Sequence, residues 1–130
     1  MNDKEKKARA KQLIADVGMF QRPKFTGASL IAANQLPEGE EIAGVFRGEK
    51  DGVNCLLIAG EEKVYIFGGG LKEMIDERIP YAQITDVAHG ADRRGAFVEI
   101  REGSHEIRVE KSLARNGAEV AGVIRSRIGQ

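Results

Sequence analysis

Two apolar runs meet at a single proline near the middle of the chain, and this corner limits the possible folds more than any other feature. Residues 77–87 read ERIPYAQITDV, with apolar positions recurring on both sides of Pro80. Proline lacks a backbone donor and biases the residue before it towards an extended conformation. We therefore expect a strand that ends here, a change of direction, and a second strand. In this interpretation the fold-specifying residues are Ile79, Pro80, Tyr81, Ile84 and Val87.

Short apolar runs separated by glycine-rich and acidic turns lie on both sides of the corner. A spacing of roughly 8–12 residues between such runs is typical of antiparallel strands in a sandwich or barrel. In the last two runs apolar and charged residues alternate, so each of these strands is expected to have one solvated face. The expected strands are residues 42–47, 53–59, 64–67, 71–79, 84–89, 95–101 and 105–110, with a turn at Gly68-Gly69-Gly70.

Helical periodicity dominates the first 35 residues. In residues 3–17 one face is formed by Ala10, Leu13, Ile14 and Val17, with lysines around the remainder, which predicts a basic amphipathic docking helix. A second, shorter helix is expected over residues 25–35. The turn sequence LPEGE at residues 36–40 follows it. We place a domain boundary there, between an N-terminal helical appendage (1–35) and a barrel domain (36–130).

The chain ends in a further amphipathic helix, for which the sequence offers two starts, Ser112 and Asn116. Glycine inside a helix costs about 1 kcal/mol relative to alanine. That cost is explained if Gly117 and Gly122 face the sheets and permit close approach. The expected buried side of this helix carries Leu113, Gly117, Val120, Ile124 and Ile128.

Composition narrows the function classes. The 130 residues contain 20 basic and 20 acidic side chains, so no overall positive field exists to hold nucleic acid. Residues 1–35 carry seven basic and three acidic groups, a net +4, and residues 36–130 carry the balancing −4. The single cysteine, Cys55, fits a reducing compartment. With no apolar run of signal-peptide or membrane-spanning length, we expect a cytoplasmic protein.

Seven short strands with a break before the fifth, followed by one helix, suggest a small barrel capped by a helix. The sequence resembles the bacterial pleckstrin-homology-like domains, the YokE-like group in particular. The resemblance lies in the LPEGE opening at 36–40, the aliphatic and aromatic strands at 56–67, and the corner formed by Ile79-Pro80-Tyr81 with Ile84 and Val87. It implies a mostly β fold of seven strands in two sheets rolled into a barrel, with the C-terminal helix at one open end. Domains of this fold bind lipids, peptides or one another.

No group of residues in the sequence points to catalysis, a metal or a cofactor. The two histidines lack partners at metal-ligand spacing, and Cys55 sits in an apolar run. In phosphoinositide-binding relatives of the wider superfamily, basic residues follow the first strand and line the second. Here the second strand has none, which favours solvated turns. The candidate binding face is therefore limited to Arg47, Lys50, Arg93 and Arg94.

Three functions remain open at this stage. The first is a non-catalytic interaction or assembly module that binds a protein partner or itself, since the +4 and −4 segments attract. The second is a peripheral binder of anionic membranes using the basic helix at residues 3–17. The third is a small-molecule carrier with a cavity in the barrel.

Overall fold

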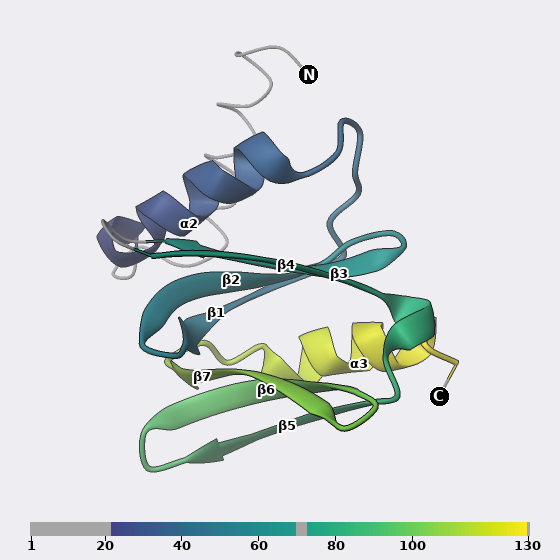
Figure 1. Cartoon of the computed structure of the whole chain (residues 1–130). Coiled ribbons are helices and arrows are strands. Elements are labelled where there is room, and N and C mark those ends of the chain that lie inside the picture. The colour runs from purple at the N-terminus through teal and green to yellow at the C-terminus, as the bar shows by residue number, and fades with distance from the viewer. Residues whose placement is uncertain (1–21, 70–72, 130) are drawn as a thin grey trace.

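The computed structural model describes residues 22–69 and 73–129. In chain order, one helix is followed by seven strands and then by a second helix, and a short 3-10 helix follows the fourth strand (Figure 1). The predicted helix at 25–35 is confirmed and begins three residues earlier. The elements are α2 (Arg22–Gln35), β1 (Gly44–Lys50), β2 (Val53–Ala59), β3 (Lys63–Gly69), β4 (Met74–Pro80), η2 (Tyr81–Gln83), β5 (Asp86–Asp92), β6 (Gly95–Glu102), β7 (His105–Ser112) and α3 (Gly117–Arg127).

The strands form one antiparallel series in the order β4-β3-β2-β1-β7-β6-β5. β1 and β7 pair only at Glu49 and Glu110, so the sheet bends sharply there into two layers. Figure 1 shows β1–β4 in one layer, β5–β7 in the other, and α3 between them at one end. α3 bridges the two layers: the Asn116 amide donates to the Val45 carbonyl and Arg125 donates to the Val87 carbonyl. This helix-capped antiparallel barrel has the pleckstrin-homology-like architecture, and the predicted fold class is confirmed.

The main core lies between the two layers and under α3. Its largest side chains include Phe46, Leu57, Ile66, Ile100 and Ile124, all fully buried. The crossing of β1 over β7 depends on Gly48. A Cβ at this position would lie 2.7 Å from both the Glu110 carbonyl oxygen and a Val109 methyl, closer than side chains approach in folded proteins. Only glycine lets these strands cross at this separation.

The corner occurs where the sequence predicts it. β4 ends at Pro80, and the turn of η2 leads through Ile84 into β5, which begins at Asp86 and not at residue 84. The side chains of Ile79, Tyr81, Ile84 and Val87 are buried in the main core. That these residues specify the fold stays a prediction.

The first hairpin is tighter than expected. The sequence suggested a strand ending at Arg47 and a turn over residues 48–52, but β1 continues to Lys50. The turn consists of Asp51 (φ 53°) and Gly52 (φ 81°) alone. Positive φ at both central residues is the two-residue hairpin geometry that Asp-Gly favours. The expected glycine turn at 68–70 is also displaced, since Gly68 and Gly69 belong to β3 and Gly70 lies outside the described residues.

The C-terminal helix follows the second of the two predicted starts. Ser112 ends β7, and α3 begins at Gly117 after Asn116. Leu113, expected on the buried side, is 69% exposed because it precedes the helix and does not follow its period. Gly117 packs beside Phe46 as expected. Gly122 does not face the sheets: a Cβ there would meet nothing within 4 Å.

One position on the expected solvated face of β6 is buried. Glu99 points away from the main core, yet only 8% of its surface is exposed. Its carboxylate lies 3.2 Å from Arg101 Nε and 3.5 Å from a guanidinium nitrogen of Arg108. The two arginine side chains therefore cover it, and an alternating sequence pattern does not predict such a cover.

Candidate functional site

The first half of the predicted basic binding face does not converge on a site. Arg47 and Lys50 are three residues apart on β1, so their side chains leave opposite faces of the sheet. Burial lowers the pKa of the Arg47 guanidinium, and its Nε is buried with no hydrogen-bond partner in the described part of the chain. Lys50 Nζ lies 3.1 Å from the Asp51 carboxylate and 3.7 Å from that of Glu77. The Lys50 ammonium is thus already matched by two carboxylates.

The other half of that face is formed by the turn between β5 and β6. Arg93 and Arg94 are both exposed there, at the end of the barrel that also carries the β1–β2 turn (Figure 1). Arg94 reaches the carboxylates of Asp92 at 3.4 Å and Glu110 at 3.2 Å. The backbone N–H of Arg94, together with its side chain, lowers the pKa of Asp92. The Arg94 guanidinium is therefore paired with carboxylates beside its own turn. The predicted face is not preorganised to bind a phosphate.

The outer face of β5–β7 is a network of paired charges. Arg108 contacts the carboxylates of Asp92, Glu99 and Glu110 at 3.0–3.5 Å. Its guanidinium carbon also lies 3.7 Å from the centre of the Phe97 ring. Exposed ion pairs of this kind contribute little individually. They nevertheless satisfy one another, so this face offers a partner little uncompensated charge.

An apolar surface on the outer side of the first layer was not predicted. We call the side chains of Val45, Leu56, Ile58, Tyr65 and Phe67 the helix-docking surface. α2 covers it with Phe25, Ala28 and Ala32, and together with Leu36, which directly follows the helix, forms with it a second hydrophobic core. Figure 1 shows α2 lying across the first layer, on the side opposite α3.

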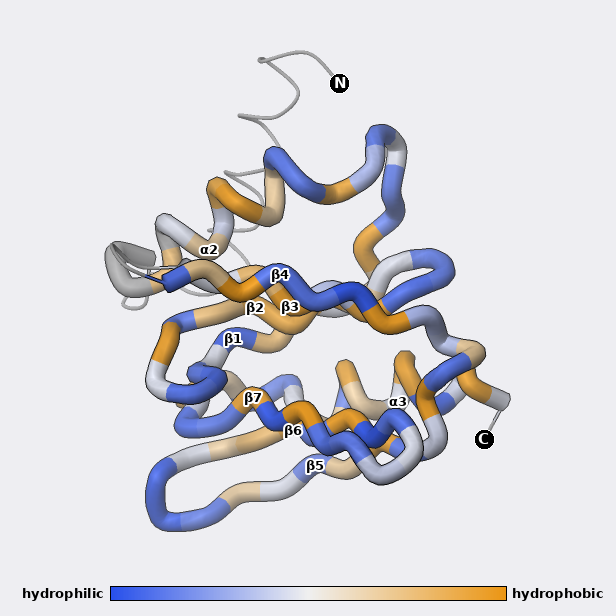
Figure 2. The backbone as a smooth tube through the Cα atoms, viewed as in Figure 1, coloured by the Kyte–Doolittle hydropathy of each residue, from blue (hydrophilic) through white to orange (hydrophobic). Residues whose placement is uncertain are grey.

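A sequence signal for this surface was present. Residues 55–59 and 64–67 are apolar without alternation, and all of them are buried. Strands that bury both faces read as continuous apolar runs. Figure 2 shows the same contrast, with hydrophobic colour along β2 and β3 and hydrophilic colour at the hairpin turns. The sequence of β2 and β3 therefore indicates that an element packs on each of their two faces. α2 packs on the outer one.

α2 lies against the end of β3. A Cβ on Gly27 would lie 3.5 Å from the Gly69 carbonyl oxygen, and one on Gly69 would lie 2.6 Å from Ile31 Cδ1. At the end of α2, Arg78 donates to Gln35 at 3.1 Å. Ile31 and Gly69 are thus in close contact, whereas Gly27 lies at an ordinary contact distance.

The segment after α2 is fixed to the barrel at the β2–β3 turn. Glu40 accepts hydrogen bonds from the Tyr65 hydroxyl at 3.1 Å and from the Glu61 backbone N–H at 3.2 Å. In return, the Glu61 carboxylate accepts from the Glu41 N–H at 3.0 Å. The Tyr81 hydroxyl donates to the Gly60 carbonyl at 2.7 Å in the same region. These hydrogen bonds join the segment after α2, the β2–β3 turn and the corner after Pro80.

Burial raises the pKa values of two tyrosines in this region and of the cysteine on β2. Burial, with the neighbouring Glu40 carboxylate, raises the pKa of Tyr65 to about 12. Burial also raises the pKa of Tyr81 to about 12, and that of the Cys55 thiol to about 12. A buried thiol with a raised pKa is a poor nucleophile.

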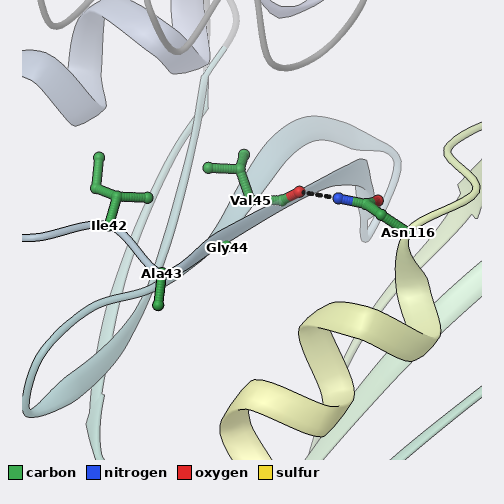
Figure 3. Close-up of a pocket in the computed structure, with 5 residues that line it drawn as sticks. All are labelled: Ile42, Ala43, Gly44, Val45 and Asn116. Carbon is green, nitrogen blue, oxygen red and sulfur yellow. Dashed lines mark hydrogen bonds between the residues drawn. The ribbon is translucent and has the colours of Figure 1, made fainter.

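A small cavity lies between the start of β1 and the start of α3 (Figure 3). Its volume is about 230 Å³, and its lining is Ile42, Ala43, Gly44, Val45 and Asn116. Asn116 Nδ2 donates to the Val45 carbonyl at 2.7 Å across one side of it. Sites for drug-sized ligands usually measure about 300–1,000 Å³. The cavity lies outside the barrel core and is smaller than such sites.

Three further points concern the predicted docking helix, metal ligands and membrane-spanning helices. The docking helix formed by Ala10, Leu13, Ile14 and Val17 lies in residues 1–21, which the structure does not describe. Within residues 22–69 and 73–129, no cluster of three His, Cys, Asp or Glu side chains is arranged to hold a metal ion. In the same ranges no helix is both long and apolar enough to cross a membrane.

Comparison with known proteins adds little beyond this geometry. No protein-family model matches the sequence, and no curated protein matches it. Among solved structures, the chain is similar to a pleckstrin homology domain from Shewanella amazonensis SB2B, with 15% sequence identity and a TM-score of 0.49. The match covers 87% of this chain and 98% of that domain. The strand order and the capping helix define the fold.

Proposed function

We propose that this chain is a non-catalytic interaction and assembly module of pleckstrin-homology-like fold, related to the YokE-like bacterial domains, that binds protein partners or itself. The observation that carries the proposal is the helix seated on the helix-docking surface. The barrel already holds one helix on its first layer through apolar contacts, and a helix packed on an apolar surface is a contact that proteins also use between chains. The paired charges at the two basic turns favour such contacts over phosphate binding.

Self-association and partner binding are tested together. Light scattering of the purified full chain over a wide concentration range reports assembly, and a pull-down from the native cell reports partners. We expect a mass above that of the monomer at high concentration, or a partner retained at physiological salt. A strictly monomeric chain that retains no protein would remove the proposal.

Binding to anionic membranes by the basic helix predicted at residues 3–17 is the alternative. The net +4 charge of residues 1–35 supports it. Co-sedimentation with vesicles containing phosphatidylserine tests it, since electrostatic binding must weaken as salt rises. The same sedimentation with neutral vesicles is the control, and equal recovery on both would count against the alternative.

A further inference from the structure

We propose that Asn116 is a site of deamidation, that the docked α3 protects it, and that the reaction removes one of the ties between α3 and β1. The sequence contains four asparagines, at positions 2, 34, 54 and 116, and only Asn116 is followed by glycine. The backbone nitrogen of glycine is the least hindered nucleophile that can follow an asparagine, because glycine has no Cβ and adopts most backbone conformations. This inference is independent of the proposed partner binding.

The reaction takes place within the chain and needs only water as a co-reactant. The Gly117 nitrogen attacks Asn116 Cγ, a new C–N bond forms, and the side-chain nitrogen leaves as ammonia with the proton of the Gly117 N–H. Water then opens the five-membered succinimide by adding its hydroxyl to one ring carbonyl, while its proton returns to the ring nitrogen. The product at position 116 is aspartate or isoaspartate, depending on which carbonyl is attacked. A neutral amide has then become a carboxylate, a change to which asparagine is prone on heating.

The nucleophile is not held by a hydrogen bond. Gly117 is the first residue of α3, and the first bond within the helix runs from the Val120 N–H to the Asn116 carbonyl at 3.0 Å. The N–H groups in the first turn of a helix have no acceptor within the helix. The Asn116 side chain does not cap them, and its residue is partly exposed to water. Within the described residues, no hydrogen bond therefore fixes the Gly117 N–H.

The electrophile, by contrast, is held while α3 is docked. Asn116 Nδ2 donates to the Val45 carbonyl at 2.7 Å, and the side chain points from the start of α3 to β1 (Figure 3). The Asn116 ψ of 17° leads the backbone into α3, so the Gly117 nitrogen must turn before it reaches Cγ. Gly117 is also buried beside Phe46, which opposes that turn. Because such a reaction depends on orientation, we expect it to proceed from states in which the first turn of α3 has opened.

The product cannot restore the tie to β1. A carboxylate has no N–H to donate, so an oxygen of aspartate would face the Val45 carbonyl oxygen. Asn116 Oδ1 is already buried without a hydrogen-bond partner in the described part of the chain, and a charge left there would be costly. The free N–H groups of α3 offer the aspartate a better partner, since an N-terminal helix end favours acidic caps. The start of α3 thereby exchanges its bond to β1 for a cap on its own helix.

Mass spectrometry of peptides from the full chain measures the reaction. Samples are incubated at neutral pH, folded or in concentrated urea, and the conversion of amide to acid is followed at each asparagine. We expect conversion first at Asn116, several-fold faster in urea than in the folded chain. Arg125→Ala removes the bond from α3 to the Val87 carbonyl and should raise the rate in the folded chain several-fold. Gly122→Ala, in open space within α3, should lower it.

Each part of the inference can fail separately. No conversion at Asn116 in urea would overturn the site, and equal rates in the folded chain and in urea would overturn its protection by α3. Gly117→Ala is the control for the attacking residue and should slow the reaction in urea.

Hydrogen exchange of Asn116→Asp tests the consequence. Exchange should become slower at the first-turn amides of α3 and faster at the start of β1, whereas the exposed Asn34→Asp should change neither. Unchanged exchange, or exchange that is faster in both segments, would overturn the proposed change of partner.

Discussion

Replacing Phe25 by alanine should destabilise the whole fold, although this residue precedes the barrel. Its side chain is 2% exposed and packs in the core that α2 forms with the helix-docking surface. Deleting a packed phenylalanine side chain costs about 3–5 kcal/mol. Phe25 is the fourth residue of α2, where a helix end can relax into the space left behind. We therefore expect the lower end, about 3 kcal/mol of the free energy of unfolding.

Urea denaturation followed by circular dichroism measures this change. With a slope near 2 kcal/mol per molar urea, the midpoint should fall by about 1.5 M. The matched control is Leu30→Ala on the same helix, whose side chain is 51% exposed. Substitution at such a site changes stability by at most about 0.5 kcal/mol. Equal midpoints for the two variants would refute the assignment of α2 to the cooperative unit.

Three further predictions concern the β2–β3 turn, α3 and the tyrosines. Glu40→Ala should lower the free energy of unfolding by roughly 1–2 kcal/mol in the same urea assay, because it strips the Tyr65 hydroxyl of its acceptor; Glu40→Gln retains an acceptor oxygen and should lose less. Gly60→Ala should be destabilising because its Cβ would lie 2.8 Å from the Tyr65 ring. Gly122→Ala, in open space inside α3, should stabilise the fold by about 0.5–1 kcal/mol. A higher urea midpoint for Gly60→Ala than for Gly122→Ala would contradict both predictions. The pKa values of Tyr65 and Tyr81 are raised to about 12, so tyrosine absorbance at 295 nm should titrate well above its ordinary range near pH 10 in the folded chain. Since the folded pKa exceeds the unfolded one, the stability that they contribute is complete below about pH 10 and is lost as the pH rises towards 12.

Much of the strand pattern was accessible from sequence. The prediction for β2 matches the structure residue for residue, because glycines bound the run on both sides. β1 runs further than predicted because Asp51-Gly52, a local signal, sets a two-residue turn. At the C-terminus, Leu113 fits the helical period but precedes the helix. Periodicity alone does not distinguish a residue in a helix from one in the preceding connection.

The candidate site was harder to predict. The candidate binding face was predicted from basic residues near two turns, but Lys50 and Arg94 each face carboxylates from distant strands. Charge pairing of this kind depends on which strands are neighbours. The helix-docking surface had a sequence signal in the unbroken apolar runs, yet that signal does not identify the covering element.

The sequence by itself determined where most of the strands lie and the corner at Pro80, because these follow from local backbone preferences. Only the tertiary structure decided that β1 crosses β7 at Gly48, that two arginines cover Glu99, and that α2 occupies the outer face of the first layer. Each of these depends on side chains brought together from distant positions, where shape and charge must match across elements. No local preference encodes such a match.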